Sequence, residues 1–288
     1  MSEIFCIKKT DDNYPHLLRE SIAPPQTLYC RGDKKLLQAQ KLCAIVGSRT
    51  PTPYGLSATD SVVEACVARD VVTVSGLAFG IDARVHTHTL ESRGKTIAVL
   101  GSSVDDASVY PRAHVRLAQR IIQQHGLLIS EYPEGTKPHK GAFPLRNRII
   151  AGLTQATCVV EAKEKSGSLI TAYSALDNNR EVYAVPGSIF SPQSQGTLGL
   201  IQRGAIPWIN HNSFEELFAR ISYTDTISHL APEEKKIVEL CSQAQSLDML
   251  LIHCTLPLST LHEHVGRLLL NGYITLTPSG EFLAVRRV

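Results

Sequence analysis

Short apolar runs rich in β-branched residues recur along the chain as far as residue 209. They lie at 43–47, 71–76, 96–101, 127–130, 157–162, 181–187 and 205–209. Between them the apolar residues follow the spacing of helices that bury one face, for example at 54–69 and 113–125. Because strands that alternate with helices build a mainly parallel sheet, the pattern predicts an α/β, Rossmann-like domain with helices on both faces of its sheet.

Four loops that follow predicted strands consist of glycine, serine and charged residues. They are the segments 46–50, 75–82, 100–103 and 164–172. Small residues let backbone N–H groups approach a ligand, and the N-terminus of the next helix carries a partial positive charge. Since parallel strands end at one edge of a sheet, these loops predict an extended phosphate-binding surface. None has the glycine spacing of a dinucleotide fingerprint or a P-loop, which disfavours both sites.

The hydrophobic pattern changes after Arg220. Helical spacing occurs at 232–243, 246–253 and 258–270. Two strand-like runs follow at 273–277 and 281–285, with a turn between them at 278–280. Three helices and a hairpin outline a winged helix, but its expected recognition helix carries only one arginine, Arg267, and major-groove readers usually carry more cations. We therefore expect a small winged-helix-like domain at 230–288 that serves a partner, with duplex reading as the alternative.

The first 40 residues read as a short helix and a proline-bounded extended strand that leads into the sheet. The expected parts are an N-terminal segment 1–40, a Rossmann-like single-strand-binding domain 41–222 and the winged-helix-like domain 230–288. A chain of 288 residues with 43% hydrophobic residues can bury cores of this size. No apolar run approaches the roughly 20 residues of a membrane span, and no signal core is present, so we expect a cytoplasmic protein.

Charge and cysteine usage narrow the classes of function. Seven scattered cysteines without a C-x-x-C pair predict neither a disulfide framework nor a zinc site.

The net charge of +2 argues against a protein that coats nucleic acid with its whole surface, so charge must be judged locally. Residues 135–160 contain no acidic residue, and their basic residues are Lys137, Lys140, Arg146 and Arg148. This stretch predicts a local anion-binding surface, with a solvated basic loop as the alternative.

The segment GAFPLRNRIIAGL, residues 141–153, joins the basic stretch to an apolar helical pattern. Pro144 suits the start of a helix, because its missing N–H would have no intrahelical partner there. We expect Arg146 and Arg148 in the first turn, where cations are unfavourable beside the positive end of the helix dipole and a bound phosphate chain would compensate. The alternative is that these arginines pair with acidic residues, the candidates being Glu131, Glu134 and Glu161.

Phe143 follows Lys140 by three residues, so one loop can present a ring and an ammonium group. Stacking of a base on an aromatic ring contributes about 1 to 3 kcal/mol and requires an unpaired base, so this pair favours single strands. A plain hydrophobic anchor is the alternative for Phe143.

Asp82 and His86 share a helix face, but no third ligand is evident, so we predict no metal site and expect Asp82 to cap its helix.

Several motifs occur in order between residues 14 and 218. They are AIVGSR, SGLAFGIDARVH, TIAVLG, SEYPEGT, FPLRNRIIAGL, VVEAKEKSGSLITA and YAVPG. Together they resemble the DNA-processing protein A family, also called Smf, and the tail resembles the C-terminal module of many members. The resemblance implies a non-enzymatic protein of natural transformation, without a cofactor, that binds and protects single-stranded DNA. It also implies displacement of single-strand-binding protein, loading of RecA recombinase, and a homodimer formed through the Rossmann-like domain.

Transferred residue by residue, the family resemblance gives a set of DNA-binding positions. They are Gly47, Ser48, Arg49, Lys140, Phe143, Arg146, Asn147, Arg148, Ser166, Gly167 and Ser168. The chain departs from the family pattern at Phe79, usually arginine, at Ser103, near a usual glycine, and at Leu198, often asparagine. These departures concern the detailed shape of the phosphate pocket.

Two other classes of function remain open from the sequence. One is a Rossmann-like nucleotide-processing enzyme of the phosphoribohydrolase type, although the chain contains no Gly-Gly dipeptide for the G-G-x-G-T signature of that class. The other is a winged-helix DNA-binding regulator, which would prefer a defined duplex sequence over any single strand.

Overall fold

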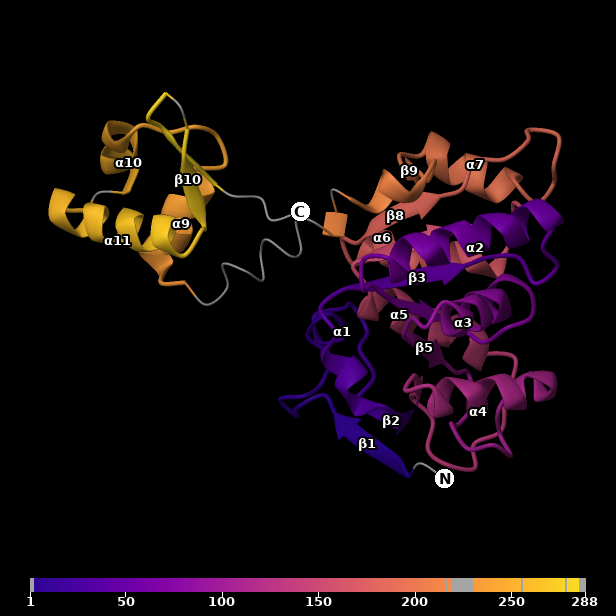
Figure 1. Ribbon diagram of the computed structural model, residues 1–288. Coiled ribbons are helices and arrows are strands. Elements are labelled where there is room, and N and C mark those ends of the chain that lie inside the picture. The colour runs from indigo at the N-terminus through magenta and orange to yellow at the C-terminus, as the bar shows by residue number, and fades with distance from the viewer. Residues whose placement is uncertain (1–2, 216, 219–229, 255, 278, 285–288) are drawn as a thin grey trace. The chain divides into compact units, whose positions relative to one another are not determined.

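The computed structural model describes residues 3–215, 217–218, 230–254, 256–277 and 279–284 (Figure 1). The chain divides into two compact units, Met1–Phe214 and Glu215–Val288. The predicted segments and domains include positions that lie outside the described residues, namely 1–2, 216, 219–222, 255, 278 and 285–288.

The first unit is built on a nine-stranded sheet of order β1-β2-β6-β5-β4-β3-β7-β8-β9. The strands are β1 (Ile4–Lys8), β2 (Thr27–Gly32), β3 (Leu42–Val46), β4 (Val72–Ser75), β5 (Thr96–Val99), β6 (Leu127–Ser130), β7 (Ala156–Val159), β8 (Glu181–Ala184) and β9 (Ile206–Pro207). All neighbouring pairs from β6 to β9 are parallel. The mainly parallel α/β sheet predicted from the apolar runs is confirmed.

The first 40 residues differ from the expected segment, because they contribute two strands to this sheet. β1 pairs antiparallel with β2, and β2 pairs antiparallel with β6. β1 was not predicted, since it lies at the sheet edge and buries only Ile7, which leaves a weak hydrophobic signal. The first unit therefore begins well before residue 41.

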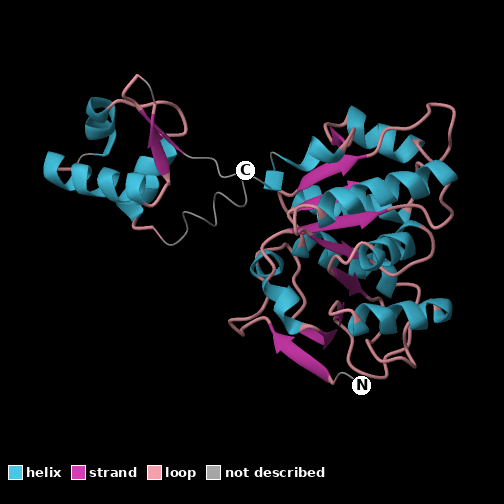
Figure 2. Ribbon diagram, viewed as in Figure 1, coloured by secondary structure: helices cyan, strands magenta, loops and turns pink. Residues whose placement is uncertain are grey.

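Helices cover both faces of the sheet (Figures 1 and 2). One layer contains α2 (Pro53–Val67), α3 (Ile81–Glu91) and α4 (Val115–Gln123), and the other contains α1 (His16–Arg19), α5 (Ala142–Leu153) and α6 (Gly167–Asp177). Alternate strand residues serve two cores: Ile97 and Val99 belong to one apolar cluster, and Ala98 belongs to another. The burial of both faces explains why these strands read as continuous apolar runs.

The order of the parallel strands reverses beside β3. The chain moves outward from β3 through β4, β5 and β6, and then returns to place β7 on the other side of β3. Loops at such a point diverge above and below the sheet, which leaves a crevice at the carboxyl ends of the strands where ligands bind in doubly wound folds. The topology therefore places the expected site between β3 and β7.

The second unit contains three helices and an antiparallel hairpin around its own apolar core. Its elements are α9 (Pro232–Leu240), α10 (Leu247–Cys254), α11 (Leu258–Leu270), β10 (Ile274–Leu276) and β11 (Phe282–Ala284). This is the element order expected of a winged-helix-like domain. Arg267 on α11 is paired with the buried Glu234 at 3.2 Å, so the one arginine of this helix is already engaged.

All seven cysteines are free thiols, and all except Cys6 are buried, as expected for reduced core residues. Among the described residues, no helix combines the length and the apolar character needed to cross a membrane.

Candidate nucleic-acid interface

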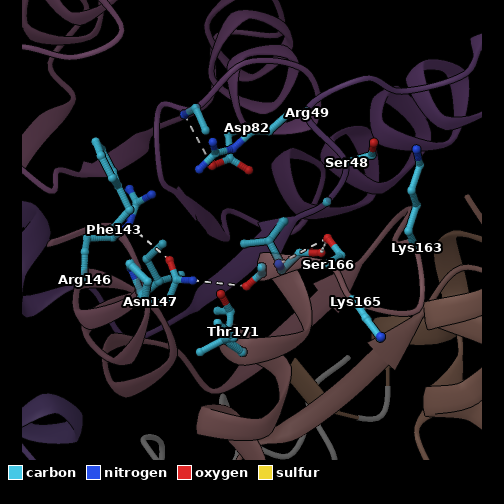
Figure 3. Close-up of a pocket in the computed structure, with 18 of the residues that line it drawn as sticks. Ser48, Arg49, Asp82, Phe143, Arg146, Asn147, Lys163, Lys165, Ser166 and Thr171 are labelled. Carbon is cyan, nitrogen blue, oxygen red and sulfur yellow. Dashed lines mark hydrogen bonds between the residues drawn. The ribbon is translucent and has the colours of Figure 1, made fainter. Parts of the chain in front are cut away.

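A cleft of about 650 Å³ opens where the strand order reverses, at the carboxyl ends of β3 and β7 (Figure 3). Its walls come from the loop after β3, the first turns of α5, and the segment that leads into α6. Ten of the eleven predicted positions line it: Gly47, Ser48, Arg49, Lys140, Phe143, Arg146, Asn147, Ser166, Gly167 and Ser168. Segments about 120 residues apart in sequence are thus brought together by the reversal of strand order, and Arg148 is the exception.

The loop after β3 is fixed tightly against α3. A Cβ atom at Gly47 would lie 2.7 Å from Cγ1 of Ile81, so only glycine allows this approach. The buried Ser48 hydroxyl accepts a hydrogen bond from the backbone N–H of Thr50 at 3.1 Å, which shapes the turn. The loop thereby holds Arg49 exposed at the cleft.

The N-terminus of α6 faces the cleft. Ser166 is the N-cap, and its hydroxyl accepts from the backbone N–H of Ser168 at 3.4 Å. No atom lies within 4 Å of a Cβ built on Gly167, so this position opens into free space. The first N–H groups of a helix have no intrahelical partner and point along the positive end of its dipole, which suits them to an anion.

Helix α5 begins earlier than the sequence predicted. Ala142 is its first residue, and the backbone N–H of Ala142 donates to the carbonyl of His139 at 3.1 Å. Pro144 still lies in the first turn, where no intrahelical bond is lost. Arg146 and Arg148, however, lie in the second turn, so the expected conflict between their charges and the first turn does not arise.

Arg146 is a buried residue of the cleft lining and braces the strand ends. Its guanidinium donates to the carbonyl of Gly76 at 2.5 Å and to the carbonyl of Val99. A Cβ atom at Gly76 would lie 2.3 Å from this guanidinium, so the brace requires glycine. Burial lowers the pKa of Arg146 to about 10, against the opposing effect of the Asp82 carboxylate. The guanidinium is therefore held by backbone carbonyls of the protein.

Arg148 points away from the cleft and is held by protein partners. Its guanidinium lies 2.5 Å from the carboxylate of Glu131 and also donates to the carbonyl of Ala23. This is the glutamate pairing that the sequence left as the alternative. The periodicity of the helix explains it, because residues two apart point to different sides.

Two further cations of the cleft, Lys163 and Lys165, lie between β7 and α6. Neither was named from the sequence, although the predicted phosphate-binding loop 164–172 contains Lys165. With Arg49 and Lys140 they form a set of four exposed cations that we call the cleft cations (Figure 3 labels Arg49, Lys163 and Lys165). The arginine ion pairs in the described part of the first unit involve Arg31, Arg84 and Arg148. Lys165, directly before the N-cap Ser166, was the signal available in the sequence.

Phe143 is half-buried in the wall of the cleft. A Cβ atom at Gly101 would lie 2.9 Å from its ring, and the ring of Tyr110 lies 5.6 Å away between centroids. Phe143 therefore combines the hydrophobic anchor with a ring on the cleft surface. Asn147, next to it on α5, donates to the carbonyl of Gly167 at 3.2 Å and ties α5 to the N-terminus of α6.

The three departures from the family pattern lie outside the cleft lining. Phe79 is exposed and packs edge-on against the ring of His114, with 4.8 Å between centroids. Ser103 is buried and donates to the carboxylate of Asp105. Leu198 lies on α7 (Gln195–Gln202). The walls of the cleft are therefore formed without these positions.

Asp82 and His86 are both buried, and Asp82 also lines the cleft, where the sequence had not predicted a binding residue. His86 is buried, and its Nδ1 lies 2.7 Å from the hydroxyl of Thr96. Burial, together with the nearby charge of Arg146, lowers the pKa of His86 to about 3, so the ring is neutral. The expectation that Asp82 caps α3 was wrong, since Gly80 is the N-cap and Asp82 lies in the first turn.

Comparison with known proteins gives a consistent match. The family model described as DNA recombination-mediator protein A matches residues 5–219. DNA processing protein DprA from Bacillus subtilis is 44% identical over 214 residues, which are 74% of this chain and 71% of that protein.

Two solved structures resemble the fold. The crystal structure of DNA processing protein A from Streptococcus pneumoniae has a TM-score of 0.69 and 39% identity, over 74% of each chain. DNA processing protein A from Helicobacter pylori, whose structure concerns its single-stranded DNA binding mode, has a TM-score of 0.67 and 30% identity, over 76% of this chain and 99% of that one.

Proposed function

Because the chain belongs to the DNA recombination-mediator protein A family, we propose that it binds single-stranded DNA in the cleft between β3 and β7, largely without sequence preference. The observation that carries the proposal is the meeting of two kinds of group in one cleft. Exposed cations and the α6 N-terminus suit phosphates, and the Phe143 ring suits a base.

The arrangement favours a single strand over a duplex. The cleft cations lie on loops and helix starts along its walls, where they can follow a flexible phosphate backbone. The Phe143 ring lies in the wall of the same cleft, so only a base splayed out of its stack can reach it. A duplex keeps its bases paired and offers this wall only phosphates.

The wider role that we propose follows from family membership. The protein protects incoming single strands in natural transformation, helps displace single-strand-binding protein, and loads RecA recombinase onto the strand. It acts as a homodimer, as a binding protein rather than an enzyme, and without a cofactor. The Rossmann-like domain carries strand binding, and the winged-helix-like domain serves as an accessory module.

A gel-shift comparison tests the central proposal. We expect the purified chain to bind a single-stranded oligonucleotide more tightly than the matched duplex, and to increase RecA assembly on strands covered by single-strand-binding protein. Equal or tighter binding to the duplex would contradict the proposal. Incubation with AMP and related nucleotides tests the enzyme alternative. Steady release of free base by the wild-type chain would favour an enzyme if mutation of the cleft loops abolished that release.

A further inference from the structure

A second cavity of about 310 Å³ lies beside the cleft, beyond the carboxyl end of β8. It is lined by Thr52, Tyr54, Glu161, Gly187, Ser188, Ser191 and Ser194. We call it the hydroxyl cavity, because most of its lining side chains carry a hydroxyl group. Its size is at the lower end of the range for small-molecule sites and is sufficient for one nucleobase.

The hydroxyl cavity and the cleft share two loops. On the first loop, Thr50 lines the cleft and Thr52 lines the cavity. On the second loop, Lys163 lines the cleft and Glu161 lines the cavity. Two residues of chain span at most about 7 Å, so the two rims are neighbours. A strand that leaves the cleft along these loops therefore meets the cavity next.

Gln193 fixes the cavity in this position. Its side chain accepts from the hydroxyl of Ser48 at 3.3 Å and donates to the carbonyl of Thr50 at 2.8 Å. The segment between β8 and α7, which supplies the serines of the cavity, is thereby tied to the rim of the cleft. The rims of the two sites are therefore joined by these hydrogen bonds.

Tyr54 supplies an aromatic ring at the cavity. The ring is held in place because its hydroxyl donates to the carbonyl of Pro186 at 2.6 Å, and the residue remains 53% exposed. A fixed, exposed ring binds an unstacked base at low entropic cost. Phe190, on the segment that supplies the serines, is 89% exposed and adds a second ring near this edge.

Glu161 supplies a carboxylate to the lining. It is 2% exposed and accepts from the backbone N–H of Thr52 at 2.9 Å and from the Thr52 hydroxyl. A Cβ atom at Gly55 would lie 2.3 Å from Oε2, so glycine is needed to accommodate this carboxylate. Each carboxylate oxygen can accept a second hydrogen bond, so the group can still receive N–H donors from a ligand.

We propose that the hydroxyl cavity is a second base subsite, which takes the base next to the nucleotides in the cleft and prefers guanine. The Tyr54 ring stacks on the base, and the Glu161 carboxylate accepts from its Watson–Crick edge. Guanine presents two adjacent N–H donors to a carboxylate, whereas thymine places a carbonyl on each side of its single N–H. This subsite rests on the proposed binding of single-stranded DNA.

The experiment compares three single strands of equal length and charge: alternating thymine and guanine, alternating thymine and inosine, and thymine alone. Inosine lacks the exocyclic amino group, so it removes one donor. The wild-type chain should bind the guanine strand about tenfold more tightly than the thymine strand, as a bidentate contact provides, with the inosine strand between them. Equal affinities for all three overturn the guanine subsite and leave strand binding intact. Failure to bind any strand overturns the proposed function as well.

Glu161→Gln tests the role of the carboxylate. The amide oxygen can still accept from the backbone N–H of Thr52, but the other acceptor becomes a donor, so circular dichroism must show that the variant is folded. The affinity ratio between the guanine and thymine strands should fall close to one, whereas the matched control Glu239→Gln, an exposed residue of α9, should keep the wild-type ratio. An unchanged ratio in Glu161→Gln contradicts the assignment.

Tyr54 is tested independently by photo-crosslinking, which does not depend on the stability of a Glu161 variant. A thymine strand with 5-iodouracil at successive positions should crosslink to Tyr54, as peptide mass spectrometry will show. Tyr54→Ala should lose this crosslinked peptide, and Tyr173→Ala, a control 39% exposed outside both cavities, should retain it. Crosslinks confined to Phe143 and its neighbours would place no base in the hydroxyl cavity.

Discussion

Three arginines predicted as one DNA-binding group take three different roles at the scale of single residues. Arg49 is exposed at the cleft, Arg146 is buried against strand-end carbonyls, and Arg148 is paired with Glu131. Of the three, only Arg49 is exposed. Residue type and local sequence were the same kind of evidence for all three, and the partners around each side chain decided the outcome.

We predict that Arg49→Ala and Arg148→Ala separate DNA binding from stability. Arg49→Ala should weaken strand binding. It should also lower the slope of log affinity against log salt concentration by about 0.7, because one phosphate contact is lost. Arg148→Ala should leave the slope unchanged and lower the free energy of unfolding by about 1 to 3 kcal/mol, since a charged hydrogen bond to Glu131 is removed. Salt titrations and urea unfolding of both variants check this. A lower salt slope in Arg148→Ala, with the slope of Arg49→Ala unchanged, would show that Arg148 reaches the strand.

Lys140 and Phe143 provide a second comparison, between charge and stacking. Lys140→Ala should reduce the log–log salt slope by about 0.7, the effect of one phosphate contact on a single strand. Phe143→Ala should cost about 1 to 3 kcal/mol of binding free energy at a nearly constant slope, because stacking releases no counterions. Titration at several salt concentrations measures both, after circular dichroism has verified folding. The stacking interpretation fails if Phe143→Ala binds like the wild type or changes the slope as Lys140→Ala does.

At the scale of elements, two helix starts and one strand-end loop form the proposed binding surface. The Asn147 side chain joins α5 to α6, and Gly47 allows the loop after β3 to lie against α3. The N-terminus of α6 is the most open of these features, because space is free around Gly167. This helix start is the place where binding can be changed with the least disturbance of the fold.

We predict that Gly167→Asp abolishes most strand binding without loss of stability. The aspartate lies at the first position of α6, where the helix dipole stabilises an anion by about 0.3 to 1 kcal/mol. The same charge occupies the phosphate position, and like charges across an interface cost several kcal/mol, so affinity should fall at least about tenfold. Thermal unfolding and strand titration measure the two effects, with the uncharged Gly167→Ala as control. Retained affinity in the aspartate variant would exclude α6 as the phosphate site.

At the scale of the whole molecule, the chain contains two units with separate apolar cores. The second core gathers residues between Ile237 and Phe282, and all four cleft cations lie in the first unit. The cationic residue of α11, Arg267, is paired with Glu234. We therefore expect strand binding to be a property of the first unit.

Deletion of residues 230–288 should leave the affinity for single strands largely unchanged, because the lining residues of the cleft belong to the first unit. The truncated and full-length chains are to be compared by strand titration, with circular dichroism to show that the truncated chain is folded. A folded fragment that has lost most of its affinity would place the binding site, at least in part, in the second unit.

The order of strands and helices was largely determined by the sequence itself. Apolar runs with helical segments between them predict parallel strands buried on both faces, since a strand buried on both faces must be apolar at every position. β3 to β8 were predicted within a few residues, as were the three helices of the second unit. The edge strand β1 was missed, because one buried residue is too weak a signal.

The position of the candidate site was also largely determined by the sequence, whereas the role of each side chain was decided only by the tertiary structure. Glycine–serine loops after strands must meet at one sheet edge, whatever the details of packing. Whether an arginine is free depends on carbonyls and carboxylates from other parts of the chain, as Val99 shows for Arg146 and Glu131 shows for Arg148. No local pattern encodes those partners, because strand order brings them together. The hydroxyl cavity has the same origin, since Thr52 and Glu161 are 109 residues apart in sequence.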